Sequence, residues 1–172
     1  MHKKYTKQLF LFFLLLSSCF CSEDEPLRNT RRDYIGDNIR IDGFYYHYFQ
    51  EKITGVLLYR NGVFFEVSGD GKDRTKPEEV ETLLTEEHIK LVKSKKYHCG
   101  IFIVEGNRIL FETWRITQGN HNAVFQSGEI LNDTTFLITK HNYSDAGIKD
   151  VNYPYYFYPY SPKPDSTNIF IE

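Results

Sequence analysis

The sequence predicts a mainly β domain built as an antiparallel meander. Within residues 100–140, four runs rich in Ile, Val, Phe, Thr and Trp are separated by short segments containing Gly, Asn or Asp. This alternation is typical of consecutive hairpins. Aromatic residues make up 16% of the chain and Met occurs once, which also favours sheet over helix. Because such hairpins cannot bury an apolar face by themselves, we expect about eight or nine strands to share one sheet or to close it into a barrel.

Three runs before residue 70 extend this pattern. Residues 39–49 have strand composition, with Gly43 marking a bend. Residues 53–60 and 63–68 flank Asn61-Gly62, a dipeptide that favours a type I′ hairpin turn, which needs positive φ at both positions. The polar residues 68–76 then predict a loop.

From residue 76 to residue 95 the apolar spacing changes to a helical period and predicts one helical insertion. The residues at this spacing are Val80, Leu83, Leu84, His88, Leu91 and Val92. Thr75 and Glu78 fit a capping box, and Thr85 can begin a second helical segment. Since the neighbouring strands are apolar on both faces, we expect a stripe of Val80, Leu84 and Leu91 to cover their outer side.

The C-terminal part predicts a loop and two further strands. Residues 142–152 are polar and without period, and residues 153–160 form an aromatic run containing Pro154 and Pro159, which favours an edge strand. After a turn at 161–167, residues 168–171 predict a short last strand.

Residues 1–18 predict a signal peptide. Three lysines precede the apolar run 9–16, which is too short to span a bilayer, since that takes ~20 residues. Leu16-Ser17-Ser18-Cys19 then resembles the lipobox of bacterial lipoproteins. This resemblance implies that Cys19 carries acyl chains such as palmitate, and that the mature chain is anchored to a membrane through this lipid. The alternative is an ordinary secretory signal in which Cys19 is incidental.

Residues 19–37 predict a flexible tether, because they mix charged and polar residues with few apolar ones. The acidic cluster at 22–25 resembles a surface-export signal of lipoproteins in some Gram-negative bacteria, and a solvated tether explains it equally well. The expected location is therefore the cell envelope, lipid-anchored in the outer membrane and either periplasmic or surface-exposed.

Residues 38–172 resemble the lipocalin-like barrels found in many bacterial lipoproteins. The resemblance rests on the number of antiparallel runs behind a secretory signal and on Gly43-Phe44-Tyr45, which is close to the Gly-x-Trp of lipocalins but has Tyr in place of Trp. The helix also lies in the middle of the chain, whereas lipocalins place theirs after the eighth strand. The resemblance implies a barrel that binds a small apolar or amphipathic ligand without a cofactor.

Charge and motifs exclude several classes of function. Without the signal peptide, 18 basic residues remain against 23 acidic ones, so we expect no nucleic-acid partner. The mature histidines have no metal-ligand spacing, and no catalytic motif is present, so neither a metal site nor an enzyme is expected. We expect Cys99 to be buried and inert rather than bridged to Cys21.

The candidate ligand-lining residues are aromatic side chains and one acid: Tyr45, Glu112, Trp114, Phe125, Phe136 and Tyr156. We expect Trp114 on the inner wall near Phe136, with Glu112 beside it, because an inward acid next to an aromatic side chain indicates a lined pocket rather than a dry core. Filling the core is the alternative role for such aromatic residues. The corresponding alternative function is a structural or accessory subunit of an envelope protein complex without a small ligand.

Overall fold

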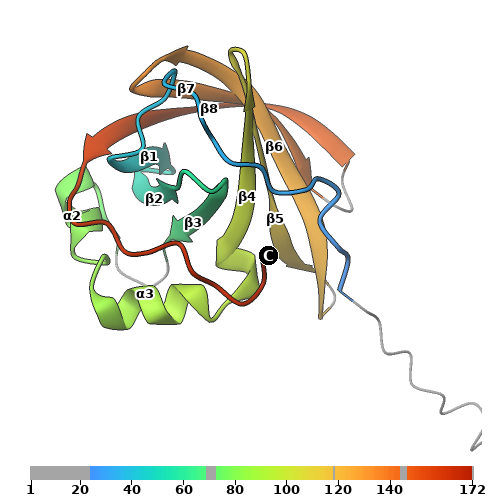
Figure 1. Ribbon diagram of the computed structural model, residues 1–172, viewed down its shortest axis with the longest axis horizontal. Helices are drawn as coiled ribbons and strands as arrows, with labels where there is room; N and C mark the ends of the chain where they lie inside the picture. The colour runs from blue at the N-terminus through green and yellow to red at the C-terminus, as the bar shows by residue number, and fades with distance from the viewer. Residues whose placement is uncertain (1–23, 69–72, 118, 144–146, 172) are drawn as a thin grey trace, which may run out of the picture.

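The computed structural model describes residues 24–68, 73–117, 119–143 and 147–171. In these residues, eight antiparallel strands form a closed barrel in chain order, with the last strand pairing back to the first (Figure 1). The strands are β1 (Gly43–Phe49), β2 (Lys52–Leu58), β3 (Val63–Val67), β4 (Cys99–Glu105), β5 (Arg108–Thr117), β6 (Asn120–Asn132), β7 (Thr135–Tyr143) and β8 (Gly147–Pro159). The predicted antiparallel barrel is therefore confirmed.

The hairpin at Asn61-Gly62 is confirmed, but its turn is not of type I′. Gly62 has a φ of 76°, whereas Asn61 is not among the residues with positive φ. Tyr59 N donates to Val63 O at 3.0 Å and Gly62 N donates to Tyr59 O at 2.9 Å, so the loop is wider than a two-residue turn. Gly62 is required for a second reason, because the carbonyl of Arg32 packs where a Cβ would stand.

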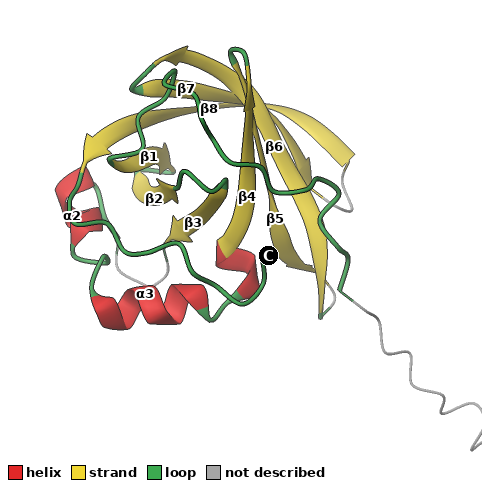
Figure 2. Cartoon of the chain, viewed as in Figure 1, coloured by secondary structure: helices red, strands yellow, loops and turns green. Residues whose placement is uncertain are grey.

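Two short helices and a 3₁₀ turn form the insertion between β3 and β4 (Figure 2). They are α2 (Pro77–Glu81), α3 (Glu86–Lys93) and η1 (Lys96–His98). The expected Thr75–Glu78 capping box is wrong, because Glu79 lies one residue later and its carboxylate accepts from Thr75 N at 2.7 Å. The second start at Thr85 is confirmed, since its hydroxyl accepts from His88 N at 3.3 Å.

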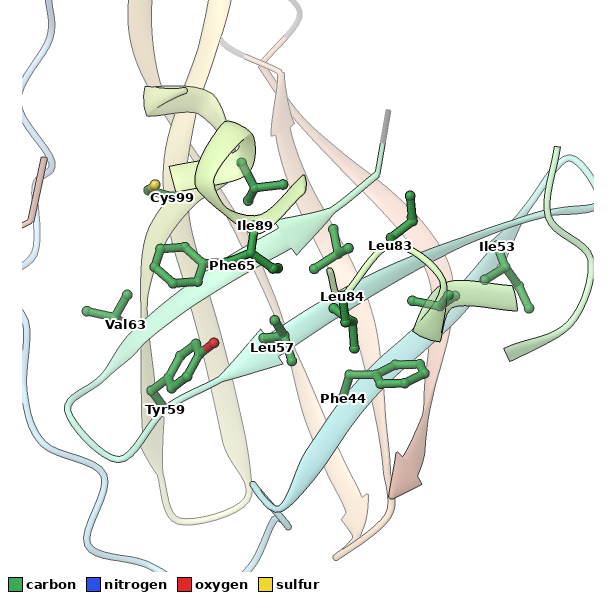
Figure 3. Packing of buried hydrophobic residues seen from close by; sticks show 13 residues of the cluster. Phe44, Ile53, Leu57, Tyr59, Val63, Phe65, Leu83, Leu84, Ile89 and Cys99 are labelled. Atoms are coloured by element: carbon green, nitrogen blue, oxygen red, sulfur yellow. The ribbon is translucent and has the colours of Figure 1, made fainter. Parts of the chain in front are cut away.

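The helices cover the outer face of β2 and β3, as predicted (Figure 3). Val80 and Leu84 are buried in this contact, together with Leu57 and Phe65 of the sheet. The prediction for Leu91 is wrong, because its side chain is 51% exposed. Since α3 begins at a new N-cap, its buried face is set by Ile89 and Val92 rather than continued from α2.

The C-terminal predictions need three corrections. Most of the expected loop 142–152 is strand, because β7 continues to Tyr143 and β8 begins at Gly147. β8 is not an edge strand, since it pairs with both β7 and β1. Its pairing with β1 runs only from Tyr156 to Pro159, so Pro154 needs ladder partners on one side alone. Residues 168–171 form no strand, and Ile169 and Phe170 lie in a bend.

The described part of the predicted tether is not flexible but bound to the barrel. We call residues 24–41 the N-terminal strap. Its Tyr34 and Ile39 are buried in the barrel core. Its backbone and side chains bond to three turns at one end of the barrel: Tyr34 N to Arg60 O at 2.7 Å, Asn38 Nδ2 to Gly106 O at 2.6 Å, and Arg40 N to Asp133 O at 2.9 Å. The strap therefore plugs this end.

The predicted signal peptide and the lipidation residue Cys19 lie outside the described residues. None of the helices in the described ranges is long and apolar enough to cross a membrane.

The helical cover gives a matched test of packing. We expect Leu84→Asp to lower the free energy of unfolding by about 3 kcal/mol, because it buries an unpaired charge where a side chain that is 8% exposed now packs. Leu91→Asp, in the exposed position, should change it by less than about 0.5 kcal/mol. Urea unfolding measures both free energies. Equal losses in the two variants would contradict the placement of Leu91 on the exposed face of α3.

Candidate binding pocket

Strand alternation divides the barrel into an inner and an outer face. Along β5, Phe111, Thr113 and Arg115 point inward, and Glu112 and Trp114 point outward. The inward residues continue a set contributed by every strand. The sequence prediction chose the opposite face of this strand.

Aromatic side chains fill the interior near the plugged end. The rings of Tyr45 and Phe136 lie 4.9 Å apart, and the rings of Phe111 and Phe136 lie 5.5 Å apart. The Tyr45 hydroxyl donates to Asp133 O at 2.9 Å. Tyr45 and Phe136 are thus inside, as predicted, but they form a dry core rather than a pocket wall.

Toward the other end, the interior opens into a cavity of about 270 Å³. Its polar lining consists of His47, Thr54, Glu66, Thr113, Arg115, Gln126 and His141. Its apolar and aromatic lining consists of Phe49, Val56, Phe64, Phe111, Tyr153 and Tyr155. β1, β5 and β7 end and β2, β6 and β8 begin at this end, which we call the mouth.

The lining changes from apolar to polar along three strands. On β2 the inward Val56 lies deeper than Thr54, and on β3 Phe64 lies deeper than Glu66. β5 repeats this order from Phe111 to Thr113 and Arg115. On β1, Phe49 follows His47 toward the mouth, and β8 contributes Tyr153 and Tyr155. The cavity therefore has an apolar floor, and its mouth carries polar side chains together with aromatic ones.

An ion pair crosses the polar half of the cavity. Arg115 Nη2 lies 2.9 Å from Glu66 Oε2, and both side chains are partly exposed. The Glu66 carboxylate raises the pKa of the Arg115 guanidinium. Since a guanidinium carries five N–H donors, this pair leaves donors that can serve a ligand.

Two buried histidines flank this pair. The His47 ring lies 4.9 Å from the ring of Tyr155 and 5.3 Å from that of Tyr153, and its side chain is 7% exposed. Burial lowers the pKa of His47. Burial, followed by the charge of Arg115, lowers the pKa of His141 to about 4. Both imidazoles are therefore neutral at pH 7, so each offers one donor and one acceptor.

His47 Nδ1 is a polar atom of the cavity that the fold does not satisfy. It is buried, and no hydrogen-bond partner for it lies among the described residues. Outside the cavity, Tyr59 Oη, His88 Nε2 and His98 Nδ1 are also buried without such a partner. An unpaired polar atom that lines a cavity costs free energy, which a bound polar group can recover.

Glu112, Trp114 and Phe125 lie on the outer face, contrary to the prediction. Glu112 pairs with Phe125 across β5 and β6, so these two share a face with Trp114. Tyr156 pairs with the outward Tyr46 and is partly exposed. None of these four residues reaches the pocket.

The strap explains why the outer position of Glu112 is buried. Its carboxylate is 1% exposed and accepts three hydrogen bonds from the strap: from Arg28 N at 2.7 Å, from Asn29 N at 2.9 Å and from Asn29 Nδ2 at 2.8 Å. Trp114 Nε1 donates to Glu25 O at 2.7 Å. The acid and the tryptophan thus hold the strap against the wall.

The first described residue of the strap is held by charge. Asp24 lies 2.9 Å from Lys96 Nζ and 2.9 Å from His121 Nδ1, and these hydrogen bonds lower the pKa of Asp24 to about 2. Lys96 Nζ also lies 4.5 Å above the Trp114 ring, which favours a cation–π contact.

Sequence reasoning missed the polar residues of the pocket. His47, Glu66, Arg115 and His141 come from four strands and share no motif. Strand alternation could have found one of them, because His47 lies two residues after Tyr45 and so faces the same side. No three His, Cys, Asp or Glu side chains of the described ranges gather as a metal site would need.

Comparison of the chain with family models, with curated proteins and with solved structures gave no match.

The neutral histidines predict a pH dependence of stability. Because the pKa of His141 is lowered from 6.5 to about 4, the unfolded chain binds more protons between these values. Its contribution to stability is complete above pH 6.5 and is lost as the pH falls toward 4, and His47 acts in the same direction. Urea unfolding between pH 7.5 and 4.5 should show this decline. His141→Gln should flatten it, and His88→Gln, outside the barrel on α3, should not; equal slopes in both variants would contradict the argument.

The outer-wall contact predicts that Glu112 holds the strap. We expect Glu112→Ala to lower the free energy of unfolding by about 2–4 kcal/mol, because three donors lose a charged acceptor. The emission of Trp114, the single tryptophan, should shift to the red and become open to quenching by iodide. Glu129→Ala, an exposed acid on β6, is the control and should change neither quantity. A folded Glu112→Ala variant with unchanged emission would show that the strap is held by other contacts.

Proposed function

We propose that this protein is a non-enzymatic binding protein of the cell envelope that takes a small amphipathic ligand into the mouth of its barrel. The observation that carries the proposal is the buried and unsatisfied Nδ1 of His47 in a cavity of about 270 Å³. The volume is close to the lower end of known ligand sites.

The order of the lining residues supports an amphipathic ligand. The apolar part would lie on the floor made by Val56, Phe64 and Phe111, and the polar part would face His47 and Arg115. A group that accepts hydrogen bonds suits this end best, because the Arg115 guanidinium lines it and carries more N–H donors than its pair with Glu66 uses. A neutral histidine adapts to the ligand by its choice of tautomer.

The membrane anchor is part of the same proposal. The lipobox Leu16-Ser17-Ser18-Cys19 supports acylation of Cys19 and attachment to the outer membrane, on its periplasmic or its outer side. Two or more acyl chains hold a protein on a membrane stably. The alternative, an accessory subunit of an envelope complex without a ligand, would be favoured by a barrel filled with aromatic side chains throughout; the polar half of this interior favours binding.

Binding can be tested with an amphipathic anion, 1-anilinonaphthalene-8-sulfonate, as the probe. We expect the native protein to bind it with increased fluorescence, and His47→Phe to weaken binding about tenfold, since one buried hydrogen bond is worth about 1.4 kcal/mol. His88→Phe on α3 is the matched control and should keep the native affinity.

A pocket-filling variant makes the outcome decisive. Thr113→Trp should abolish the probe signal, because its side chain would occupy the cavity. Undiminished binding by both Thr113→Trp and His47→Phe would place the probe elsewhere and contradict a barrel site.

A further inference from the structure

Exposed apolar side chains gather at the mouth of the barrel. Among the described residues, Tyr48 and Phe49 precede the β1–β2 turn, Ile116 precedes the end of β5, and Ile148 follows the start of β8. Each is about half exposed or more. Single exposed apolar residues are ordinary, but these come from three strands, close to the strand ends that lie at the mouth. We call these four residues the mouth rim.

The described chain begins at this same end. Asp24 bonds to His121 near the start of β6, and His121 pairs directly with the rim residue Ile116. Figure 1 shows the strap starting beside the start of β6 and running along the wall toward the opposite end of the barrel. There Arg32 reaches Glu105 of the β4–β5 hairpin, at 3.1 Å.

Several contacts fix the start of the strap. Asp24 is held by Lys96 and His121, and Glu25 bonds to Ala123 N at 3.0 Å and to Trp114 Nε1 at 2.7 Å. These contacts therefore fix the position at which the chain leaves the barrel.

Covalent reach then limits where an anchor can lie. Cys19 precedes Asp24 by five residues, which span at most about 18 Å when fully extended. β5 has ten residues, so the two ends of the wall lie about 30 Å apart. Cys19, the point where the lipid would be attached, therefore stays on the mouth side and cannot reach the plugged end.

We propose that the mouth rim contacts the surface of the bilayer that holds the lipid, so that the pocket opens onto the membrane. This inference rests on the proposed acylation of Cys19. The anchor brings the mouth end to the membrane, and the rim side chains enter the interface, where Tyr and Phe side chains are favoured.

The charged groups at the mouth are compatible with this contact. Lys52 pairs with Asp73 at 2.7 Å, and Lys140 pairs with Asp150 at 3.0 Å. Each pair joins opposite charges, so phosphatidylcholine vesicles, which carry no net charge, are a suitable surface.

Quenching by brominated acyl chains tests the orientation. The acylated protein is reconstituted in vesicles of phosphatidylcholine with brominated chains, carrying either Ile148→Trp at the rim or Leu131→Trp beside the β6–β7 turn of the plugged end. The two sites are similarly exposed, at 59% and 56%. Trp114 gives the same background in both. We expect quenching of the Ile148→Trp signal to exceed that of Leu131→Trp at least threefold, and Tyr48→Trp to behave like Ile148→Trp.

Mass spectrometry of the same vesicles separates the two proposals. Acylated Cys19 with equal quenching at both ends, or with stronger quenching of Leu131→Trp, overturns the rim contact and leaves the anchor standing. An unacylated chain that does not bind the vesicles overturns the anchor and the inference together. The binding pocket itself is tested independently by the fluorescent probe.

Discussion

The burial of one carboxylate on the outside of the barrel organises the rest of this structure. Glu112 is 1% exposed at an outward position of β5, where a bare acid would be expected to reach water. Burying it without partners would cost several kcal/mol, so the three donors of Arg28 and Asn29 are a condition of the fold rather than an addition to it. Through these contacts a polar segment becomes part of the wall. The same segment then carries Tyr34 and Ile39 into the barrel core and closes one end.

Closing one end makes the interior asymmetric, and this asymmetry locates the cavity. Near the plug, the rings of Tyr45, Phe111 and Phe136 pack against one another, and Phe111 also forms part of the cavity floor. At the mouth no strap residue lines the cavity, and the inward positions include polar side chains such as His47 and Arg115. The unsatisfied Nδ1 of His47 lies at this boundary. The position of the strap at one end of the barrel therefore accounts for a cavity whose floor is apolar and whose mouth carries polar side chains.

The sequence contains enough information for the barrel and for its helical cover, but not for the face that each β5 residue takes. The hairpins depend on local composition and turns, and the cover depends on a change of period, so both could be predicted. Residues 109–116 mix apolar and polar side chains on both faces, and the choice between the faces is made by the strap. The strap binds Glu112 mostly through backbone N–H groups. Since every residue except proline has such a group, the side-chain pattern of the sequence could not predict this contact. It therefore looked like a tether, and Trp114 was expected inside. Leu91 was misplaced for a related reason, since a new N-cap at Thr85 resets the buried face of the helix.

β5 joins the two proposed functions through neighbouring residues on opposite faces. Trp114 holds the strap on the outside, and Arg115 lines the pocket on the inside. Because successive side chains of a strand point to opposite faces, the residues that hold the strap and those that line the pocket are different sets. The chemistry of the pocket can thus change without moving the point where the chain leaves the barrel. Under the two proposals, the position of the mouth relative to a membrane and the choice of ligand are therefore set by different residues.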